Sequence, residues 1–423
     1  MAATIIEKIL ARTSGAASVR PGDLVVAKPD QVMFHDLQLA IEGLWYRPKK
    51  LSDVSRVSIV YDHAVPAPSI RDASGMKEGR RFAAEFGIER FYDLGQHGIC
   101  HVVAAEQGLA RPGELLVCPD SHTCASGALN CAGQGTGVVE MLQAMTKGEL
   151  WYIVAPTVRY EFEGSLAPGV SGKDVFFHIA QLYGGHSGTN MEFGGAGLKN
   201  LPMSDRRTIA TMCAEVSAEF AVFEYDDVTA SYLEGRLDRP VAPAHADVGA
   251  VYQDVRVVHL DEIEPYVMRP DFIPKNGVPV NEFAEHIKID QAFIGSCANG
   301  QIEDLRVAAN LLAGRHVAGG VRLLITPGSQ AIYLQAAQEG LLATLVEAGA
   351  VITAPGCGAC YGVHGGVLAP GEVCITASTR NFKGRMGSAD AKIYMGSPAT
   401  VTASAIIGYI AGPEALESAG ADR

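Results

Sequence analysis

The chain has 423 residues, enough for about three domains with sizeable cores. Hydrophobic residues make up 48% and charged residues 19%, a composition that excludes wholesale disorder and a fibrous architecture. The formal net charge of -13, without a basic cluster, would repel a phosphate backbone and argues against nucleic-acid binding. These values indicate a folded globular protein.

No apolar run reaches the roughly 20 residues that a membrane-spanning helix needs. Residues 399–410 come nearest, but Thr400, Thr402 and Ser404 interrupt them. The N-terminus lacks a secretory core with a cleavage site, and residues 1–12 predict an amphipathic helix. Nine cysteines in such a chain favour reduced thiols, metal ligands or buried side chains over disulfides. We therefore expect a cytoplasmic protein with no membrane insertion.

Short runs rich in Val and Ile, each followed by a polar or Gly-containing loop and then a helical pattern, predict parallel strands joined by crossover helices. The expected strands are 56–61, 114–117, 292–294, 321–325, 351–353 and 373–376. They predict an α/β fold with mostly parallel, doubly wound sheets. Because ligands of such sheets gather at the carboxyl ends of strands, the loops after these strands are the candidate site.

Glycine-rich tracts at 164–172 and 184–197 suggest a middle segment of different construction. We expect an α/β domain over 1–155, a middle α/β domain over 156–260 that carries Glu215, and an α/β domain over 261–423 that carries candidate cysteines and arginines. Four prolines within 265–280 predict a connector before the last domain.

The strongest chemical signal is Cys357-Gly358-Ala359-Cys360, a Cys-x-x-Cys motif that follows a predicted strand, with Cys297 after another strand. A four-cysteine zinc site would need a second close pair, and a redox pair would need to open a helix, which the downstream glycines disfavour. Metal or cluster ligands, a redox pair and structural thiols stay open. Three cysteines on a four-iron cluster would leave one iron free for substrate.

A second set of residues combines carboxylates with imidazoles, which need such partners to act as acids or bases. Its members are Asp62, His63, His101, Asp120, Ser121, His122 and Glu215. A lone histidine is more often a satisfied core residue, but repetition after several predicted strands favours a site. A third signal is the loop with Arg380 and Arg385, whose guanidinium groups suit a carboxylate; the alternative is a solvated basic turn.

These residues together resemble the aconitase superfamily, in particular the large subunits of the two-subunit isopropylmalate isomerase type. The resemblance spans nearly the whole chain. It rests on Asp62-His63, Asp120-Ser121-His122-Thr123, residues 293–300 (Phe-Ile-Gly-Ser-Cys-Ala-Asn-Gly), Thr326-Pro327-Gly328-Ser329, residues 356–360 (Gly-Cys-Gly-Ala-Cys) and residues 380–385 (Arg-Asn-Phe-Lys-Gly-Arg).

The resemblance implies that Cys297, Cys357 and Cys360 hold one 4Fe-4S cluster whose fourth iron binds substrate. It also implies acid-base pairs of Asp62 with His63, Asp120 with His101, and Glu215 with His122. Arg380, Arg385 and Ser121 are implied to contact substrate, and His35 stands where relatives place another pocket residue. The implied reaction is dehydration and rehydration of a small 2-hydroxy di- or tricarboxylic acid.

The chain departs from the family pattern in places. It has no Ser-Ser-Arg motif after Arg385, where single-chain aconitases carry their catalytic serine. The resemblance therefore implies a separate small subunit that supplies this serine and a substrate-selecting loop, and a chain that is nearly inactive alone. Ala298 and Ala359 replace the usual Thr and Pro, Thr211 stands where aconitases usually have Asn, and the loop after His122 differs.

The expected activity is isomerisation between 2-isopropylmalate and 3-isopropylmalate in leucine biosynthesis. The alternative substrates of the same architecture are homoaconitate, citramalate, dimethylmalate and maleate. An iron-sensing RNA-binding protein is a remote alternative, which the acidic composition disfavours. An electron-transfer protein is another, and it would not respond to substrate.

Overall fold

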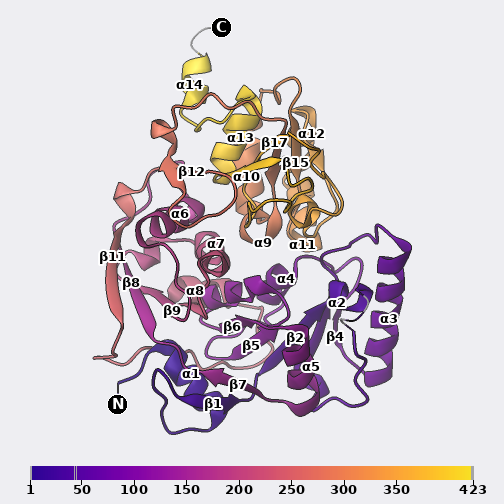
Figure 1. Cartoon of the computed structure of the whole chain (residues 1–423), viewed down its shortest axis with the longest axis vertical. Helices are drawn as coiled ribbons and strands as arrows, with labels where there is room; N and C mark the ends of the chain where they lie inside the picture. Colours follow the sequence, from indigo (N-terminus) through magenta and orange to yellow (C-terminus); the bar gives the residue numbers. More distant parts are fainter. Residues whose placement is uncertain (1, 42, 44, 421–423) are drawn as a thin grey trace. The chain divides into compact units, whose positions relative to one another are not determined.

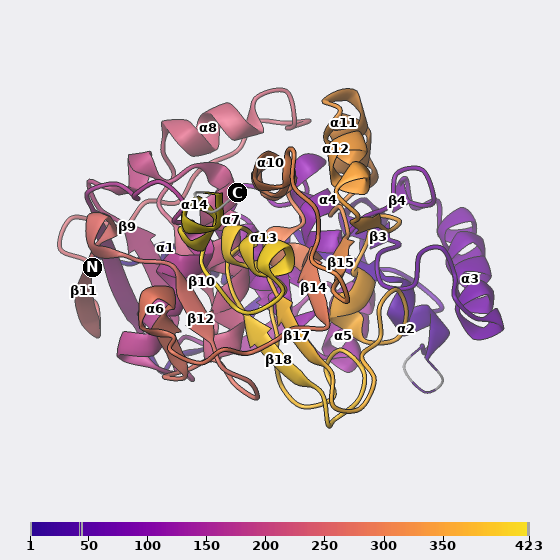
Figure 2. The ribbon, with the colours of Figure 1, turned by 90° about the horizontal axis from the view of Figure 1, so that it is seen from above.

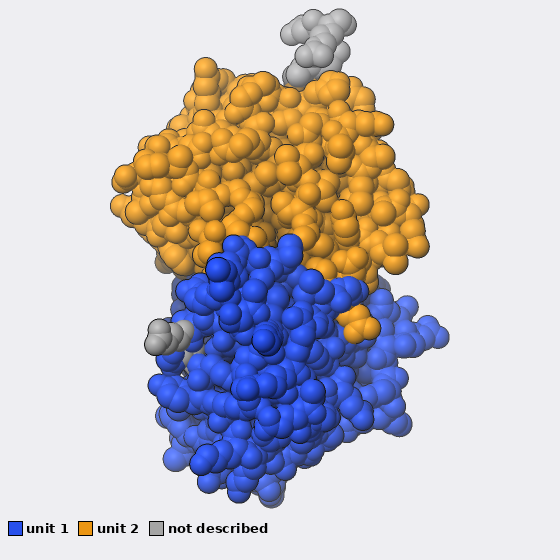
Figure 3. All heavy atoms as spheres, turned by 90° about the vertical axis from the view of Figure 1, so that its right-hand side faces the viewer, with its two compact units in different colours: residues 1–95, 100–165, 185–260 blue, residues 96–99, 166–184, 261–423 orange. Residues whose placement is uncertain are grey.

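The computed structural model describes residues 2–41, 43 and 45–420, and the chain forms two compact units (Figure 3). The first unit contains residues 1–95, 100–165 and 185–260, and the second contains 96–99, 166–184 and 261–423. Most neighbouring strands are parallel and helices connect them, which confirms the predicted α/β fold. No helix in the described ranges is long and apolar enough to span a membrane. The division into three domains stays a prediction.

The first unit contains a five-stranded parallel sheet with the order β4-β3-β2-β5-β6 (Figure 1). Its strands are β2 (Gln31–His35), β3 (Val57–Val60), β4 (Arg90–Tyr92), β5 (Leu115–Cys118) and β6 (Ala132–Gly135). The strands β2, β3 and β5 are buried along their whole length, which explains why their sequences are largely apolar and do not alternate. Their carboxyl ends lead into His35, Asp62 and Asp120 at one edge of the sheet.

Two further sheets belong to the first unit. A parallel sheet has the order β10-β9-β8-β11, and β1 pairs with β7 in an antiparallel ribbon. The parallel strands are β8 (Thr157–Glu163), β9 (Asn190–Gly194), β10 (Ala221–Phe223) and β11 (Asp254–His259); the ribbon strands are β1 (Leu24–Ala27) and β7 (Leu150–Ile153). All four parallel strands lie inside the range expected for the middle domain.

Some helices of the first unit start at side-chain caps. The Thr4 side chain and Glu7 form a capping box at the start of α1, and Ser69 caps α3. The helices are α1 (Ile5–Ser14), α2 (Asp36–Ala40), α3 (Ile70–Phe86), α4 (Cys100–Glu106), α5 (Val138–Lys147), α7 (Met203–Met212) and α8 (Asp227–Leu233). Short 3-10 helices include η1 (Val54–Arg56), η2 (Ser121–Leu129), η3 (Leu198–Asn200) and η4 (Cys213–Val216). The helix predicted at the N-terminus is thus present.

The second unit is built on a seven-stranded sheet with the order β13-β12-β18-β17-β14-β15-β16. Its strands are β12 (Tyr266–Met268), β13 (Gly277–Pro279), β14 (Gln291–Ile294), β15 (Arg322–Ile325), β16 (Val351–Ile352), β17 (Val373–Thr376) and β18 (Lys392–Met395). The five strands from β14 to β18 are parallel to one another. Their carboxyl ends therefore lead into the cysteine and arginine loops at one edge.

Helices cover this sheet. Figure 2 shows α13 over β14 and β17, and α6 packs against β12 and β13. The helices of the second unit are α6 (Gly172–Tyr183), α9 (Ser296–Asn299), α10 (Ile302–Leu312), α11 (Gln330–Gln338), α12 (Leu341–Glu347), α13 (Pro398–Ile407) and α14 (Ala415–Gly420), with the 3-10 helices η6 (Val280–Glu282) and η7 (Gly358–Tyr361). The 3-10 helix η5 spans Leu260–Glu262, where the first unit passes into the second.

The segment 265–280 is not the connector that its four prolines predicted. It contains β12 and β13, which extend the seven-stranded sheet in antiparallel fashion. Pro265 directly precedes β12, and Pro279 is the last residue of the edge strand β13. Because proline is tolerated at strand ends and sheet edges, these prolines are compatible with pairing, and the prediction was wrong.

Candidate active site

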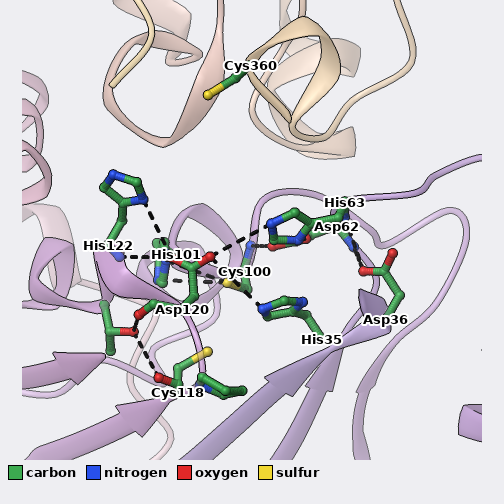
Figure 4. A network of polar contacts seen from close by, with 12 residues as sticks. His35, Asp36, Asp62, His63, Cys100, His101, Cys118, Asp120, His122 and Cys360 are labelled. Carbon is green, nitrogen blue, oxygen red and sulfur yellow. Dashed lines mark hydrogen bonds and ion pairs between the residues drawn. The ribbon is translucent and has the colours of Figure 1, made fainter. Parts of the chain in front are cut away.

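Asp120 lies at the centre of a cluster of imidazoles in the first unit (Figure 4). Its Oδ1 is 2.8 Å from His101 Nε2 and accepts a hydrogen bond of 2.8 Å from the His122 backbone N–H. Its Oδ2 is 3.8 Å from His63 Nε2 and 4.0 Å from His35 Nε2. Burial alone would raise the pKa of Asp120, but His101 and His122 outweigh it and hold this pKa well below its ordinary value. Asp120 is thus an anion facing four imidazoles.

Asp62 and His63 form a second carboxylate–imidazole pair, between Asp62 Oδ1 and His63 Nδ1. Burial opposes ionisation of Asp62, yet the charges of His63 and His35 lower its pKa to about 2. The rings of His35 and His63 stack with centroids 4.4 Å apart. Burial, reinforced by His63, lowers the pKa of His35 and favours its neutral form. The Asp62 anion therefore lies beside the imidazoles of His63 and His35, which can exchange protons.

Sequence reasoning missed Asp36, which shapes this loop. The Asp36 carboxylate accepts hydrogen bonds of 2.8, 3.1 and 2.8 Å from the backbone N–H groups of Asp62, His63 and Ala64. It thereby fixes the backbone that carries the Asp62–His63 pair. The available signal was its position directly after β2, the same topological position as the residues that were identified.

His122 and Glu215 form a third pair, with 2.8 Å between His122 Nε2 and Glu215 Oε1. Glu215 lies in η4, and η2 carries His122. Ser121 is exposed beside this pair. Thr211 is fully buried, and its hydroxyl donates a hydrogen bond of 2.6 Å to the Arg207 carbonyl within α7. The Thr211 hydroxyl is therefore engaged by its own helix.

The second unit carries the three candidate cysteines after two strands of one sheet. Cys297 lies in α9, which follows β14. Beyond β16, Cys357 directly precedes η7 and Cys360 lies within it. Cys297 and Cys360 are 9% and 3% exposed, Cys357 is half-buried, and all three are free thiols. Gly358 adopts a φ of +54°, and a Cβ there would collide with Thr326 Oγ1. The turn that presents the Cys-x-x-Cys pair thus requires glycine.

The arginine loop of the second unit reaches one of these cysteines. The Arg385 Nη2 donates toward Cys360 Sγ over 3.6 Å, and Thr379 Oγ1 is 3.8 Å from the same sulfur. Arg380 is half-buried in the same loop. A guanidinium beside a thiol favours the thiolate, which is the form that binds metal. Cys360 therefore lies in an environment suited to a ligand.

A second residue that sequence reasoning missed is Lys173. Its Nζ donates to the carbonyl oxygens of Ala377 (2.9 Å) and Ser378 (2.6 Å), just ahead of Arg380. The side chain is fully buried, at the start of α6. A buried ammonium near the positive end of a helix is costly, and these carbonyls offset that cost. No motif signals this contact, because the partners are backbone atoms about 200 residues away.

Among the described residues, one group has the spacing of a single-ion site. Ligand atoms of His35, Asp36, Asp62 and His63 lie within 4.8 Å of one another. However, both oxygens of Asp36 already accept backbone hydrogen bonds, and Asp62 accepts one of 3.0 Å from the Cys100 N–H. These contacts account for the carboxylates without an ion, so we interpret the group as a proton-handling network.

The chain is similar to known proteins over nearly its whole length. The model of the aconitase family (aconitate hydratase) matches residues 7–408. The chain belongs to the aconitase family. The resemblance seen in the motifs is thereby confirmed, and the chain is a hydro-lyase.

Related proteins align with this chain over nearly its whole length. A protein of Mycolicibacterium smegmatis named 3-isopropylmalate dehydratase large subunit is 55% identical over 97% of this chain and 96% of its own. A protein of the same name from Helicobacter hepaticus is 40% identical over 98% and 99%. The solved aconitase X of Thermococcus kodakaraensis, in its holo form, superimposes with a TM-score of 0.52 at 14% identity, covering 86% of this chain and 88% of its own, which supports the fold.

Membership of the aconitase family implies an iron–sulfur cluster, and the residues of the second unit fit one. Three free cysteines follow strands of one sheet, in loops that are largely shielded from water. The contact between Arg385 and Cys360 supplies positive charge to a sulfur ligand. Cysteine thiolates are the usual ligands of such clusters. The fit rests on the chemistry of this donor set.

The lowered pKa of Asp62 predicts a defined loss of stability in acid. A carboxylate with a depressed pKa stabilises the fold above its ordinary pKa, and this stabilisation is lost as the pH falls toward the folded value, which is about 2 here. Asp62 alone should contribute about 2 kcal/mol, lost below about pH 4. The free energy of unfolding, measured with urea, should decline less steeply in Asp62→Asn than in the wild type between about pH 5 and pH 3. Parallel declines would contradict this assignment.

Proposed function

We propose that this chain is the large subunit of a cytoplasmic hydro-lyase that interconverts 2-isopropylmalate and 3-isopropylmalate in leucine biosynthesis. The observation that supports this most directly is the 55% identity to the Mycolicibacterium smegmatis protein over nearly the whole of both chains. The reaction removes water from a 2-hydroxy acid and adds it back at the neighbouring carbon. It requires loss of a poor leaving group and removal of a weakly acidic proton beside a carboxylate.

One 4Fe-4S cluster is the proposed cofactor, with Cys297, Cys357 and Cys360 as its ligands. When bound, a cluster with three protein ligands supplies a Lewis-acidic iron that eases departure of the hydroxyl group. Arg385 beside Cys360 favours cluster binding because its positive charge stabilises the thiolate form of this ligand. Lys173 holds the backbone that leads to Arg380.

The charged groups of the two units have complementary proposed tasks. Arg380 and Arg385 bind the substrate carboxylates, because a guanidinium pairs with a carboxylate through two parallel hydrogen bonds. His63 delivers or accepts a proton at Nε2, since its Nδ1 is engaged by Asp62. His101 is held at Nε2 by Asp120, and His122 at Nε2 by Glu215.

Two residues complete the proposed substrate-binding set. Ser121 is exposed next to His122, so its hydroxyl can contact a substrate oxygen. His35 stacks on the ring of His63 and faces Asp120, which suits a residue that positions these two side chains.

A separate small subunit is the proposed partner. In this proposal it supplies the catalytic serine and the loop that selects the substrate, as the resemblance to the family implies. The names of the relatives, which are large subunits, support this assignment. We therefore expect the chain alone to be inactive or nearly so.

The test is to co-express the chain with the small subunit of the same organism and reconstitute the complex anaerobically with iron and sulfide. Turnover is followed through the ultraviolet absorbance of the unsaturated acid. We expect turnover of both isopropylmalates, little with citramalate, dimethylmalate, maleate or homoaconitate, and none by the large subunit alone. A complex with an intact cluster that turns over none of these acids would contradict the proposal.

A further inference from the structure

The β1–β7 ribbon presents an apolar face to solvent. Leu24, Val26, Trp151 and Ile153 are 69%, 51%, 60% and 63% exposed. The strand register pairs Leu24 with Ile153 and Val26 with Trp151, so the four side chains lie on one face as two cross-strand pairs. We refer to these four residues as the ribbon patch. A contiguous apolar patch of this kind on a folded unit marks a site of interaction.

The backbone of β7 is also open on one side. Within the described residues the ribbon has only two strands, so β7 has one unpaired edge. The Val154 N–H donates to the Asp23 carbonyl over 2.9 Å, and antiparallel pairing alternates between bonded and non-bonded positions. The N–H and C=O groups of Trp151 and Ile153 therefore point away from β1. Such an edge can accept an additional strand.

A hollow of about 620 Å³ lies beside β7. Its lining includes β7 itself, residues 134–137 at the end of β6 and just beyond it, and Phe220. The Tyr152 hydroxyl in its wall is buried and has no hydrogen-bond partner among the described residues, and the same holds for Thr136 Oγ1. Both atoms are shielded from solvent, so the polar groups that an occupant of the hollow can reach are the N–H and C=O groups on the free edge of β7. A polypeptide strand pairs with such an edge.

The negative charge of the hollow indicates which charge its occupant should carry. Glu140 and Glu219 are its only charged lining residues. A second copy of this chain would bring the same acidic wall against itself, at a net charge of -13 per chain. A segment carrying lysine or arginine would instead be attracted. The hollow therefore fits a basic extended segment of a different chain.

A second, smaller hollow adjoins the first. Its volume is about 190 Å³, and it shares Gln134, Gly135 and Glu219 with the larger hollow. Ser121 and Ala214 also line it, and these residues directly precede His122 and Glu215. The neighbours of the His122–Glu215 pair and the free edge of β7 thus line two adjoining hollows of the first unit.

We propose that an extended, basic segment of the small subunit adds to the free edge of β7 and covers the ribbon patch, an inference that rests on the proposed function. Its backbone pairs with Trp151 and Ile153. Its apolar side chains cover the ribbon patch, and a lysine or arginine lies between Glu140 and Glu219. The ribbon thereby anchors the small subunit beside the candidate active site.

The test compares variants of the full-length large subunit in titrations with purified small subunit. Trp151→Lys combined with Ile153→Lys should raise the Kd at least about tenfold, because lysines on a strand edge oppose strand addition and repel a basic segment. Glu219→Lys, an exposed change that removes no apolar contact, should also raise the Kd. The matched control is Val255→Lys with Val257→Lys, which alters exposed valines on another edge strand, β11, and should leave the Kd unchanged.

Hydrogen exchange gives a second readout, since the amides of Trp151 and Ile153 should become protected in the wild-type complex. Unchanged affinity of the ribbon variants together with unprotected amides would overturn the inference. The proposed function would remain intact if the complex turns over isopropylmalate. A self-association of the large subunit that the ribbon variants abolish would also overturn it. A wild-type chain that binds no small subunit would overturn the proposed function together with the inference.

Discussion

Replacing Cys357 with alanine should abolish turnover of the reconstituted complex and remove most of its iron. Even a residue that only supports a metal ligand commonly contributes 10–100-fold to affinity or activity, so loss of a ligand itself should cost more than about 100-fold. Cys357 is half-buried on the Cys-x-x-Cys turn. The other thiol of this turn, Cys360, is itself a proposed ligand and therefore cannot replace Cys357. Iron and sulfide content, visible absorbance and turnover measure the effect.

The matched control for this prediction is Cys374→Ala. Cys374 belongs to β17 of the same sheet and is fully buried, and its Sγ contacts the Ile375 carbonyl over 3.5 Å. It is a structural thiol, so the variant should keep its iron and its turnover while losing some stability. A Cys357→Ala protein with wild-type iron content would refute the proposed ligand set, as would a Cys374→Ala protein that lost its cluster although it remained folded.

The second large effect is expected from Asp120→Asn. The carboxylate lies 2.8 Å from His101 Nε2 and accepts a hydrogen bond from the His122 backbone N–H. It also faces the rings of His63 and His35. Asparagine keeps the size of the side chain but removes the charge that stabilises a protonated imidazole. The value of kcat should fall by about 100-fold to 10,000-fold, the range typical of acid–base groups, with a smaller change in KM. Steady-state kinetics across pH with 3-isopropylmalate would measure both.

Asp53→Asn serves as the control for this change of charge. Asp53 caps η1 at the surface, where it accepts a hydrogen bond of 3.0 Å from the Ser55 N–H. This variant should retain wild-type kcat and lose at most about 1 kcal/mol of stability. If Asp120→Asn keeps its kcat within a few-fold of the wild type and its cluster intact, the imidazole cluster does not handle protons in the reaction.

The sequence predicted strands well where they are buried on both faces. The expected runs 56–61, 114–117 and 373–376 correspond to β3, β5 and β17 within two residues at each end. Such strands are nearly continuous in Val, Leu and Ile, so the signal is local and strong. The segment 265–280 was predicted wrongly because two of its four prolines lie at strand ends, and a local pattern cannot distinguish such prolines from those of a loop.

The sequence by itself determined the candidate chemistry of this protein: the cysteine spacing, the carboxylate–imidazole motifs and the arginine loop are short local patterns, most of them in segments that follow strands. Tertiary structure alone decided which of them become neighbours. The strand order β3-β2-β5 brings Asp62, His35 and Asp120 together, Asp36 holds three backbone N–H groups of another loop, and Lys173 holds carbonyls about 200 residues away. Strand pairing and backbone contacts of this kind depend on how whole elements pack into a core, and that information is spread over the entire chain rather than contained in any one motif.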